Sequence, residues 1–328
     1  MADLELLTIK LQQMTIESTN LQNSTNPAIT YSACYQQCFC SDNLELMKTI
    51  ESNTIDLIYC DILYGTGRNF GEYQDLKPER DIIISHYLPR LIEMKRVLKQ
   101  NGSIYLQMDT RINHWMRILM DKVFGYENFR NEIVWAYETA GRKSKQKYRP
   151  SHDVILFYAI GNNVLYDCEY LEKIENNYSG YYEDDNGWYQ MTGTGDYSNE
   201  SILKLKEKGL IHTNGKGKHY LKIYLTKKDD GLYKTKQLRS VWDDIQTFGG
   251  VNKNLKEQFV GYPAQKPKEL IARIIKASSN EGDLVADFYL GSGTTAEVCK
   301  DLNRNFIGCD INPRAVEITL KRLNNARS

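Results

Sequence analysis

The sequence predicts an α/β protein whose one open sheet is assembled from two separate parts of the chain. Over about residues 33–160, apolar runs with the length of strands alternate with amphipathic helical segments. The same alternation returns from residue 262, whereas the stretch in between has a different composition. Alternating strands and helices are typical of a sheet with helices packed on its faces. We therefore expect an α/β domain that carries a sizeable insertion.

The N-terminal part of the sheet is expected to follow a polar extension over residues 1–32, which we interpret as an arm. The longest predicted helix, 81–99, places its apolar side chains on one face and ends before Gly102, as helical periodicity and a glycine stop signal require. The predicted order is strand 54–60, helix 81–99, strand 103–108, helix 111–124, strand 132–138 and strand 153–159.

The middle of the chain, residues 161–260, is rich in Tyr, Gly and Lys and shows no sustained helical period. Short runs such as "HYLKIYLT" favour strands. We expect a small inserted domain here, between one half of the main domain at 33–160 and the other at 261–328.

The C-terminal part repeats the α/β pattern with clear end signals. Pro267 lies where a helix begins, and Asn312 is expected to cap a last helix with Pro313 at its first position. The predicted order is helix 268–278, strand 284–287, the turn "LGSGTT", helix 294–302 and strand 306–310.

The glycine turn predicts a binding site for an adenosine-containing cofactor. A strand that runs into Gly291-x-Gly293 and then a helix allows the backbone to approach a ligand closely. Asp310 ends the next strand, 310 − 291 = 19 residues after the first glycine, where an acid binds ribose hydroxyls. The third glycine of the dinucleotide fingerprint is missing, and Thr294 follows directly. An adenosyl cofactor without a pyrophosphate is therefore favoured over NAD, with a plain turn as the alternative.

The position of this turn predicts the order of the strands. Only 328 − 310 = 18 residues follow Asp310, too few to complete a nucleotide-binding sheet. The remaining strands must come from the N-terminal half, which gives a circularly ordered variant of the fold. Ligands of open α/β sheets bind at the carboxyl ends of the strands. Asp61 and Gly291 each follow such an end, so we expect both at one cleft.

These motifs resemble those of a known family. "DILY", Asp61–Tyr64, resembles the D-P-P-Y motif, and "DFYLGSGTT" the glycine motif, of DNA amino-methyltransferases that use S-adenosylmethionine. The order of catalytic motif, recognition region and cofactor motif is similar to that of the β class, and "YPAQKPKELIARII" resembles the segment before its cofactor strand. The stretch 120–159 resembles modification subunits of Type III restriction systems. The resemblance covers about 33–160 and 262–326, and it implies a Rossmann-like methyltransferase sheet with an inserted target-recognition region.

The resemblance implies roles for the residues of the first motif. The exocyclic amine of a base is a poor nucleophile because its lone pair is delocalised into the ring. Hydrogen bonds to the Asp61 carboxylate and the Ile62 carbonyl would localise that pair, and Tyr64 would stack on a base swung out of the duplex. Ile62 and Leu63 replace the two prolines, which removes their stiffness. A strand-end aspartate beside a core tyrosine is the alternative interpretation.

The second motif supplies the expected cofactor site. Tyr289 stands where the family has phenylalanine, and ordinary helix-start chemistry is the alternative for Lys266 and Thr294. By the resemblance, the residues that bind S-adenosylmethionine are Lys266, Asp287, Tyr289, Gly291, Gly293, Thr294 and Asp310.

DNA contacts are expected from local basic segments, because Lys+Arg and Asp+Glu balance at 42 each. The segment "GRKSKQKYR" concentrates cations that suit phosphates, although a solvated surface is the alternative. In the inserted region, "KTKQLRSVWDD" offers further contacts, with burial as the alternative for the tryptophan. The expected DNA-binding residues are Arg142, Lys143, Lys145, Lys147, Arg149, Lys236, Arg239 and Trp242.

The sequence thus predicts a site-specific enzyme that moves a methyl group from S-adenosylmethionine to N6 of a flipped adenine in double-stranded DNA. An aspartate at the first motif position favours adenine. The alternatives are transfer to N4 of cytosine, a non-catalytic DNA-binding subunit that needs a partner, and methylation of RNA or of a protein amide. A homodimer and a cognate restriction endonuclease stay open as partners.

The remaining features of the sequence indicate the cellular compartment of the protein. No apolar stretch approaches the ~20 residues of a membrane span, and the seven cysteines, an odd number, agree with a reducing compartment. We therefore expect a cytoplasmic protein. Cys34, Cys38 and Cys40 do not have the C-x-x-C spacing of a metal site, which favours small residues on and beside a strand.

Overall fold

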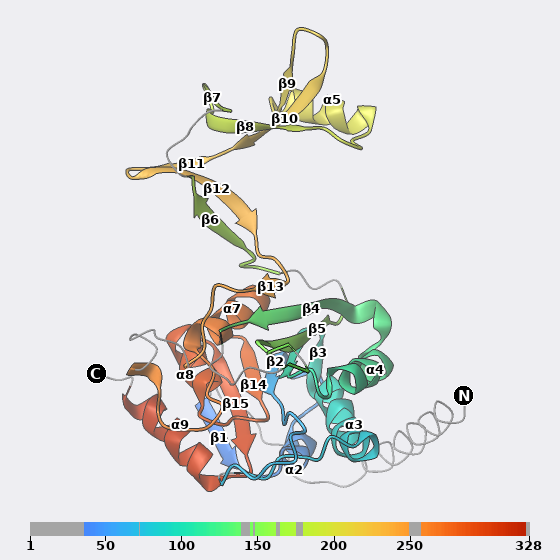
Figure 1. Ribbon diagram of the computed structural model, residues 1–328, viewed down its shortest axis with the longest axis vertical. Helices are drawn as coiled ribbons and strands as arrows, with labels where there is room; N and C mark the ends of the chain where they lie inside the picture. Colours follow the sequence, from blue (N-terminus) through green and yellow to red (C-terminus); the bar gives the residue numbers. More distant parts are fainter. Residues whose placement is uncertain are drawn as a thin grey trace. The chain divides into compact units, whose positions relative to one another are not determined.

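The computed structural model describes residues 36–71, 73–138, 145–146, 148–161, 165–174, 180–248 and 257–325 (Figure 1). The chain forms two compact units, of which the smaller is Cys168–Arg239 and the larger comprises residues 1–167 and 240–328. The expected insertion, 161–260, was wider than the smaller unit at both ends. The arm expected at 1–32 lies outside the described residues.

The larger unit is built on one eight-stranded sheet with the order β1-β15-β14-β2-β3-β5-β4-β13. Strands β1, β15, β14, β2 and β3 are mutually parallel, whereas β5 is antiparallel to both β3 and β4. The C-terminal strands β14 and β15 therefore lie between the N-terminal β1 and β2, which confirms the circular order. The strands are β1 (Gln36–Cys40), β2 (Ile55–Asp61), β3 (Leu98–Met108), β4 (Phe129–Ala136), β5 (His152–Ala159), β13 (Val241–Trp242), β14 (Leu284–Asp287) and β15 (Asn305–Asp310).

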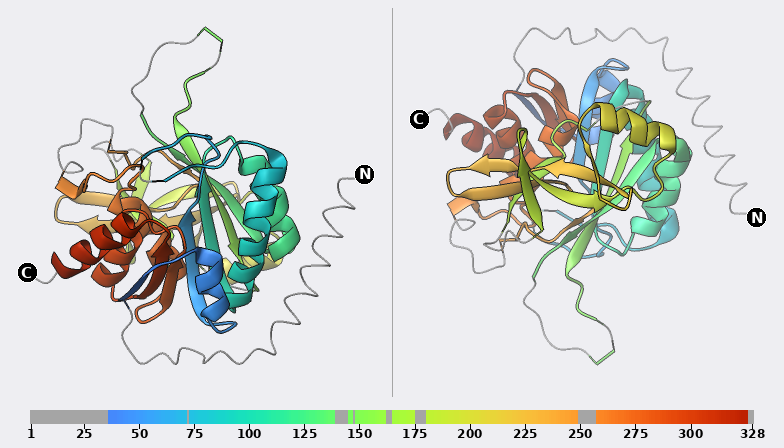
Figure 2. Two further views of the ribbon diagram at one scale, coloured as in Figure 1. Left: turned by 90° about the horizontal axis from the view of Figure 1, so that it is seen from below. Right: turned by 90° about the horizontal axis from the view of Figure 1, so that it is seen from above.

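Helices cover both faces of this sheet, and Figure 2 shows the strands between two groups of helices. Alternate residues of a strand point to opposite faces, so Ile58 of β2 packs in the core with α2, α3 and α4, whereas Leu57 and Tyr59 pack in the core with α7 and α8. Burial on both faces explains why the strands are apolar almost throughout. The helices are α2 (Asn43–Thr49), α3 (Arg80–Val97), α4 (Asn113–Phe124), α7 (Lys268–Ser278), α8 (Thr294–Asp301) and α9 (Pro313–Asn325), and a 3₁₀ turn spans Tyr126–Asn128.

The predicted elements of both halves are present. Asn312 accepts a hydrogen bond from the Arg314 amide, so it caps α9, which begins at Pro313 as expected. The expected helix 81–99 is shorter, because Leu98 adopts an extended conformation and begins β3. Among the described residues, no helix has the length and apolar character needed to cross a membrane.

The smaller unit consists of two short sheets and one helix. A four-stranded sheet has the order β7-β8-β10-β9 and a three-stranded sheet the order β11-β12-β6. The run "HYLKIYLT" forms β10 and the start of β11, as expected, whereas the helix α5 was not expected. The elements are β6 (Glu169–Lys173), β7 (Tyr181–Asp184), β8 (Gly187–Gly193), α5 (Asn199–Glu207), β9 (Ile211–Thr213), β10 (His219–Tyr224), β11 (Thr226–Lys228) and β12 (Gly231–Gln237).

Candidate active site

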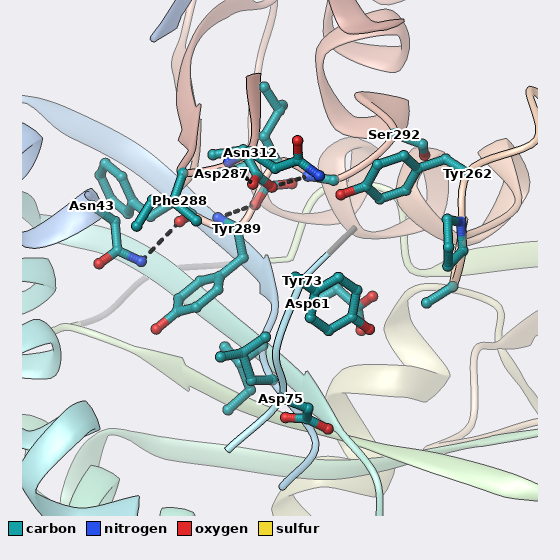
Figure 3. A pocket seen from close by; sticks show the side chains of 18 of the residues that line it. Asn43, Asp61, Tyr73, Asp75, Tyr262, Asp287, Phe288, Tyr289, Ser292 and Asn312 are labelled. Carbon is teal, nitrogen blue, oxygen red and sulfur yellow. Dashed lines mark hydrogen bonds between the residues drawn. The ribbon is translucent and has the colours of Figure 1, made fainter. Parts of the chain in front are cut away.

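The carboxyl ends of β1, β2, β14 and β15 surround a cavity of about 690 Å³ in the larger unit. Asp61 and Gly291 both line it, so the two motifs meet at one cleft as the sequence predicts. Figure 3 shows Asn43 and Tyr289 on one side of this cavity and Tyr262 on the other. The volume lies within the ~300–1,000 Å³ typical of small-ligand sites.

Asp61 ends β2 and is held by two side chains. Lys266 Nζ donates to Asp61 Oδ2 at 2.7 Å, and the Tyr64 hydroxyl donates to Oδ1 at 2.8 Å. The same ammonium lies 5.3 Å from the centre of the Tyr64 ring. Lys266, expected at the cofactor, lines the cavity and is directly bound to the expected catalytic carboxylate.

Burial shapes the acid–base behaviour of these groups. It raises the pKa of Asp61, and the attraction of the Lys266 ammonium opposes that rise. Burial and the nearby carboxylates of Asp61 and Asp153 raise the pKa of Tyr64 well above its usual value. Tyr64 therefore stays a neutral hydrogen-bond donor across the physiological pH range.

A second buried carboxylate, Asp153, completes a polar network that the sequence did not predict. Asp153 Oδ2 accepts from the Tyr64 hydroxyl at 2.7 Å and from Gln107 Nε2 at 2.9 Å, and its Oδ1 accepts from the Tyr137 hydroxyl at 2.8 Å. Only 4 % of Asp153 is exposed. A charged residue near the start of the apolar run 153–159 was the available signal.

Hydrogen bonds fix the loop where the family has its two prolines. The Ile62 amide, which a proline would lack, donates to the Gln107 carbonyl at 3.0 Å and extends the pairing of β2 with β3 by one residue. The Tyr87 hydroxyl donates to the Leu63 carbonyl at 2.9 Å. The direction of the chain is therefore set without the stiffness of proline.

Asp75 holds the next part of the same loop. Its carboxylate accepts from the amides of Gly65, Thr66 and Leu76 and from the Thr66 hydroxyl. Gly65 has a φ of +66°, and a Cβ there would lie 2.8 Å from the Ile112 side chain. A glycine is therefore required where the loop leaves the cleft.

The glycine turn after β14 is closed by two acids. The Gly291 amide donates to Asp310 Oδ2 at 2.9 Å, while Asp287 accepts from the Tyr289 amide and the Thr295 hydroxyl. Burial raises the pKa of Asp287 to about 7 and also raises that of Asp310. The expected residues Asp287, Tyr289, Gly291, Thr294 and Asp310 all line the cavity, and Gly293 precedes α8 with a φ of +74°.

The wall formed by the start of α2 and by α3 contains residues that the sequence analysis missed. Arg90 donates to Asn43 Oδ1 and to Asp42 Oδ2, both at 2.7 Å, and Asn43 donates to the Phe288 carbonyl at 2.9 Å. Burial lowers the pKa of His86 to about 4, so this imidazole is neutral at pH 7. Asp42 and Asn43 lie just beyond the end of β1, after Ser41, and this position was the usable signal.

The expected DNA contacts have different environments. Arg142, Lys143 and Lys147 lie outside the described residues, whereas Lys145, Arg149 and Arg239 are exposed. Lys236 forms an ion pair with Glu172. Trp242 is only 7 % exposed and belongs to the core on the α7 side of the sheet, which favours the alternative interpretation of a buried tryptophan.

Of the three cysteines considered above, Cys38 and Cys40 lie on β1, as small strand residues. Cys34 lies outside the described residues. No group of three or more His, Cys, Asp or Glu side chains in the described ranges could hold a metal ion.

A circularly ordered sheet with a glycine turn between two strand-end acids, beside a buried aspartate on the neighbouring strand, defines a methyltransferase class. The model of the DNA methylase family N6_N4_Mtase matches residues 55–321, and the chain belongs to this family. It is a DNA methyltransferase whose cofactor is S-adenosylmethionine, which confirms the family expected from the motifs. The family name covers both N6 and N4 amines.

Named relatives agree with this assignment. Over 292 residues the chain is 30% identical to the Type II methyltransferase M.HpaI of Haemophilus parainfluenzae, with 88% of this chain and 74% of the relative covered. It is 28% identical to the DNA adenine methyltransferase YhdJ of Escherichia coli K12, with 87% and 81% covered. The PvuII DNA methyltransferase (cytosine-N4-specific) shares the fold with a TM-score of 0.53, 14% identity, and 89% and 90% covered.

Proposed function

We propose that the protein methylates N6 of adenine in double-stranded DNA. The observation that carries this proposal is the Asp61 carboxylate at the cavity, 2.7 Å from an ammonium and beside the carbonyl of Ile62. Together they offer two acceptors to the two hydrogens of an exocyclic amine. Aspartate at this position supports adenine over cytosine, and the relative YhdJ carries the name of an adenine methyltransferase.

The cavity fits the cofactor in three respects. The backbone of Gly291 approaches the cavity without a side chain, and Asp310 can accept from ribose hydroxyls at the end of β15. Asp287 contributes negative charge for a cationic ligand. When bound, S-adenosylmethionine supplies a methyl group attached to a positively charged sulfur, which is a good leaving group.

The residues of the first motif act on the amine. Asp61 and the Ile62 carbonyl accept its two hydrogens, which localises the nitrogen lone pair toward the methyl carbon. Asp61 would take one proton from the amine as positive charge develops on its nitrogen during transfer of the methyl group that bound S-adenosylmethionine would supply. Tyr64 stacks on the extruded base, which the enzyme cannot reach inside the duplex. In-line positioning by these contacts supplies much of the acceleration.

The decisive experiment identifies the methylated base. The purified chain is incubated with tritiated S-adenosylmethionine and mixed-sequence duplex DNA, which is then digested to nucleosides. Labelled N6-methyladenine supports the proposal, and labelled N4-methylcytosine would overturn the choice of base. No label, with cofactor binding intact, would support the partner-dependent, non-catalytic alternative.

Two Asp61 variants test the site itself. Asp61→Asn keeps the shape but loses the charge, and Asp61→Ala removes the acceptor. We expect both to lose transfer while their cofactor dissociation constants, measured by calorimetry, stay within about threefold of the wild-type value. Wild-type turnover by either variant would contradict the assignment of Asp61.

Contacts with DNA and with proteins are further parts of the proposal. Lys145 and Arg149 are exposed in the larger unit, and cations at such positions suit the phosphate backbone. We propose that the smaller unit, Cys168–Arg239, reads the target sequence. We also propose that the protein acts in a restriction-modification system with a cognate endonuclease, and that it forms a homodimer. Light scattering with and without duplex DNA tests the dimer.

A further inference from the structure

The hydroxyl of Tyr64 lies between two carboxylates. It is 2.8 Å from Asp61 Oδ1 and 2.7 Å from Asp153 Oδ2. A tyrosine hydroxyl carries one proton, so it can donate to only one of these oxygens at a time. The two carboxylates therefore compete for one donor, and the occupant of the cleft decides which of them receives it.

Substrate binding changes this competition, a step that rests on the proposed function. Asp61 Oδ2 already accepts from Lys266, so we expect Oδ1 to accept a hydrogen of the target amine. The amine then competes with the Tyr64 hydroxyl for Oδ1, and the single hydroxyl proton can go to Asp153 instead. A buried hydroxyl without a partner is costly, and the ring would turn to find another acceptor.

Asp153 is placed to prevent that movement. Asp153 lies near the start of β5, whereas Asp61 lies at the end of β2, and Asp153 is nearly fully buried. Gln107 Nε2 and the Tyr137 hydroxyl fix its two oxygens, and Gln107 is itself fixed by the Tyr59 hydroxyl at 2.8 Å. The acceptor that remains for Tyr64 is therefore rigid.

We propose that Asp153 is a positioning residue for methyl transfer. It accepts the Tyr64 hydroxyl when Asp61 engages the amine, and so keeps the ring at the angle needed to stack on the flipped base. Asp153 does not line the cavity. Its effect passes through the Tyr64 hydroxyl, which makes the proposal testable by combining substitutions.

The test compares Asp153→Asn, Tyr64→Phe and the double variant in the full chain. Asp153→Asn keeps the size of the side chain, and Tyr64→Phe keeps the stacking ring but removes the hydroxyl. We expect each single change to lower kcat about tenfold, with KM for S-adenosylmethionine and the thermal midpoint near wild-type values. We expect the double variant to be within about twofold of Tyr64→Phe alone, because the residue acts through a group already removed.

Tyr137→Phe tests the support of Asp153. It removes one donor from Asp153 on the opposite oxygen and does not contact Asp61 by a hydrogen bond in the described structure. Because Tyr137 affects transfer through Asp153, its smaller loss of kcat should disappear in the Tyr64→Phe background, as that of Asp153→Asn does.

Each outcome decides a different claim. Losses of Asp153→Asn and Tyr64→Phe that multiply, or a wild-type kcat for Asp153→Asn, would overturn the positioning role alone. A loss of cofactor affinity or thermal stability that accounts for the lower kcat would assign Asp153 a structural role instead. Absence of transfer by the wild-type chain would overturn the proposed function and this inference with it.

Discussion

The ammonium of Lys266 lies 2.7 Å from the carboxylate of Asp61, although 205 residues separate them in the chain. The circular order of the sheet makes this contact possible, because β14, which follows Lys266, pairs directly with β2, which ends in Asp61. The ion pair joins the two halves of the larger unit at the cavity. It also places a positive charge beside the carboxylate that we propose accepts the amine.

Replacing Lys266 by Met should move the pH dependence of methyl transfer. Burial raises the pKa of Asp61 and the ammonium opposes that rise, so its removal raises the pKa further. In the proposed mechanism, transfer needs the ionised carboxylate and is lost as the pH falls through this pKa. The acidic limb of the kcat profile should therefore shift to higher pH. An unchanged limb with normal cofactor binding would contradict the role given to the ion pair.

Replacing Tyr87 by Phe should loosen the loop that lacks its prolines. The substitution leaves the Leu63 carbonyl without its hydroxyl partner. We expect a loss of about 1–3 kcal/mol in the free energy of unfolding, and a lower kcat. Urea denaturation and single-turnover kinetics measure the two effects. A normal kcat in a destabilised variant would show that the Leu63 carbonyl does not set the geometry of Asp61 and Ile62.

The affinity for S-adenosylmethionine should rise with pH. The pKa of Asp287 is raised to about 7, so its ionised fraction grows from about 10 % at pH 6 to about 90 % at pH 8. Because the cofactor is cationic, binding should tighten about tenfold over this range. Calorimetry at the two pH values measures the change, and Asp287→Asn should abolish most of it. If the wild-type protein binds the cofactor equally well at both pH values, the charge of Asp287 does not contribute to cofactor binding.

The two glycines of the turn should respond differently to alanine. At Gly293 a Cβ would lie 2.7 Å from the Cβ of the buried Thr319, and φ is +74°. At Gly291 the nearest side chain, Tyr262, is 3.7 Å away, and only the φ of +52° opposes the substitution. We expect Gly293→Ala to cost more than about 2 kcal/mol of stability and Gly291→Ala about 1 kcal/mol. Denaturation of both variants without cofactor measures the two losses of stability. Equal losses would contradict this prediction.

The sequence predicted those residues that follow the carboxyl end of a recognised parallel strand. Asp61, Gly291 and Asp310 meet because the carboxyl ends of parallel strands share one edge. Asp153 was missed because β5 is antiparallel, so its amino end lies at that edge. Asp42 and Asn43 were missed because β1 is five residues long and partly exposed, which gives a weak strand pattern.

Tertiary packing decided the remaining differences. The helix α5 spans only nine residues and buries none of them, so its sequence shows no sustained helical period. Trp242 belongs to a two-residue strand whose pairing with β4 buries it, and no local pattern distinguishes this from an exposed contact. The Tyr87 bond to Leu63 depends on how α3 lies over the loop. That packing cannot be predicted from the amino-acid sequence of either segment alone.

The order of the strands also has a consequence for biosynthesis. Strands β1 and β2 are synthesised early, but β15 and β14 separate them in the finished sheet, and 283 − 61 = 222 residues lie between the end of β2 and the start of β14. At about 5–20 residues per second, the ribosome needs roughly 10–45 s to add them. During this time the facing edges of β1 and β2 lack their partners and are open to pairing with other chains. Yield should therefore depend on translation speed and on chaperones that cover nascent strand edges.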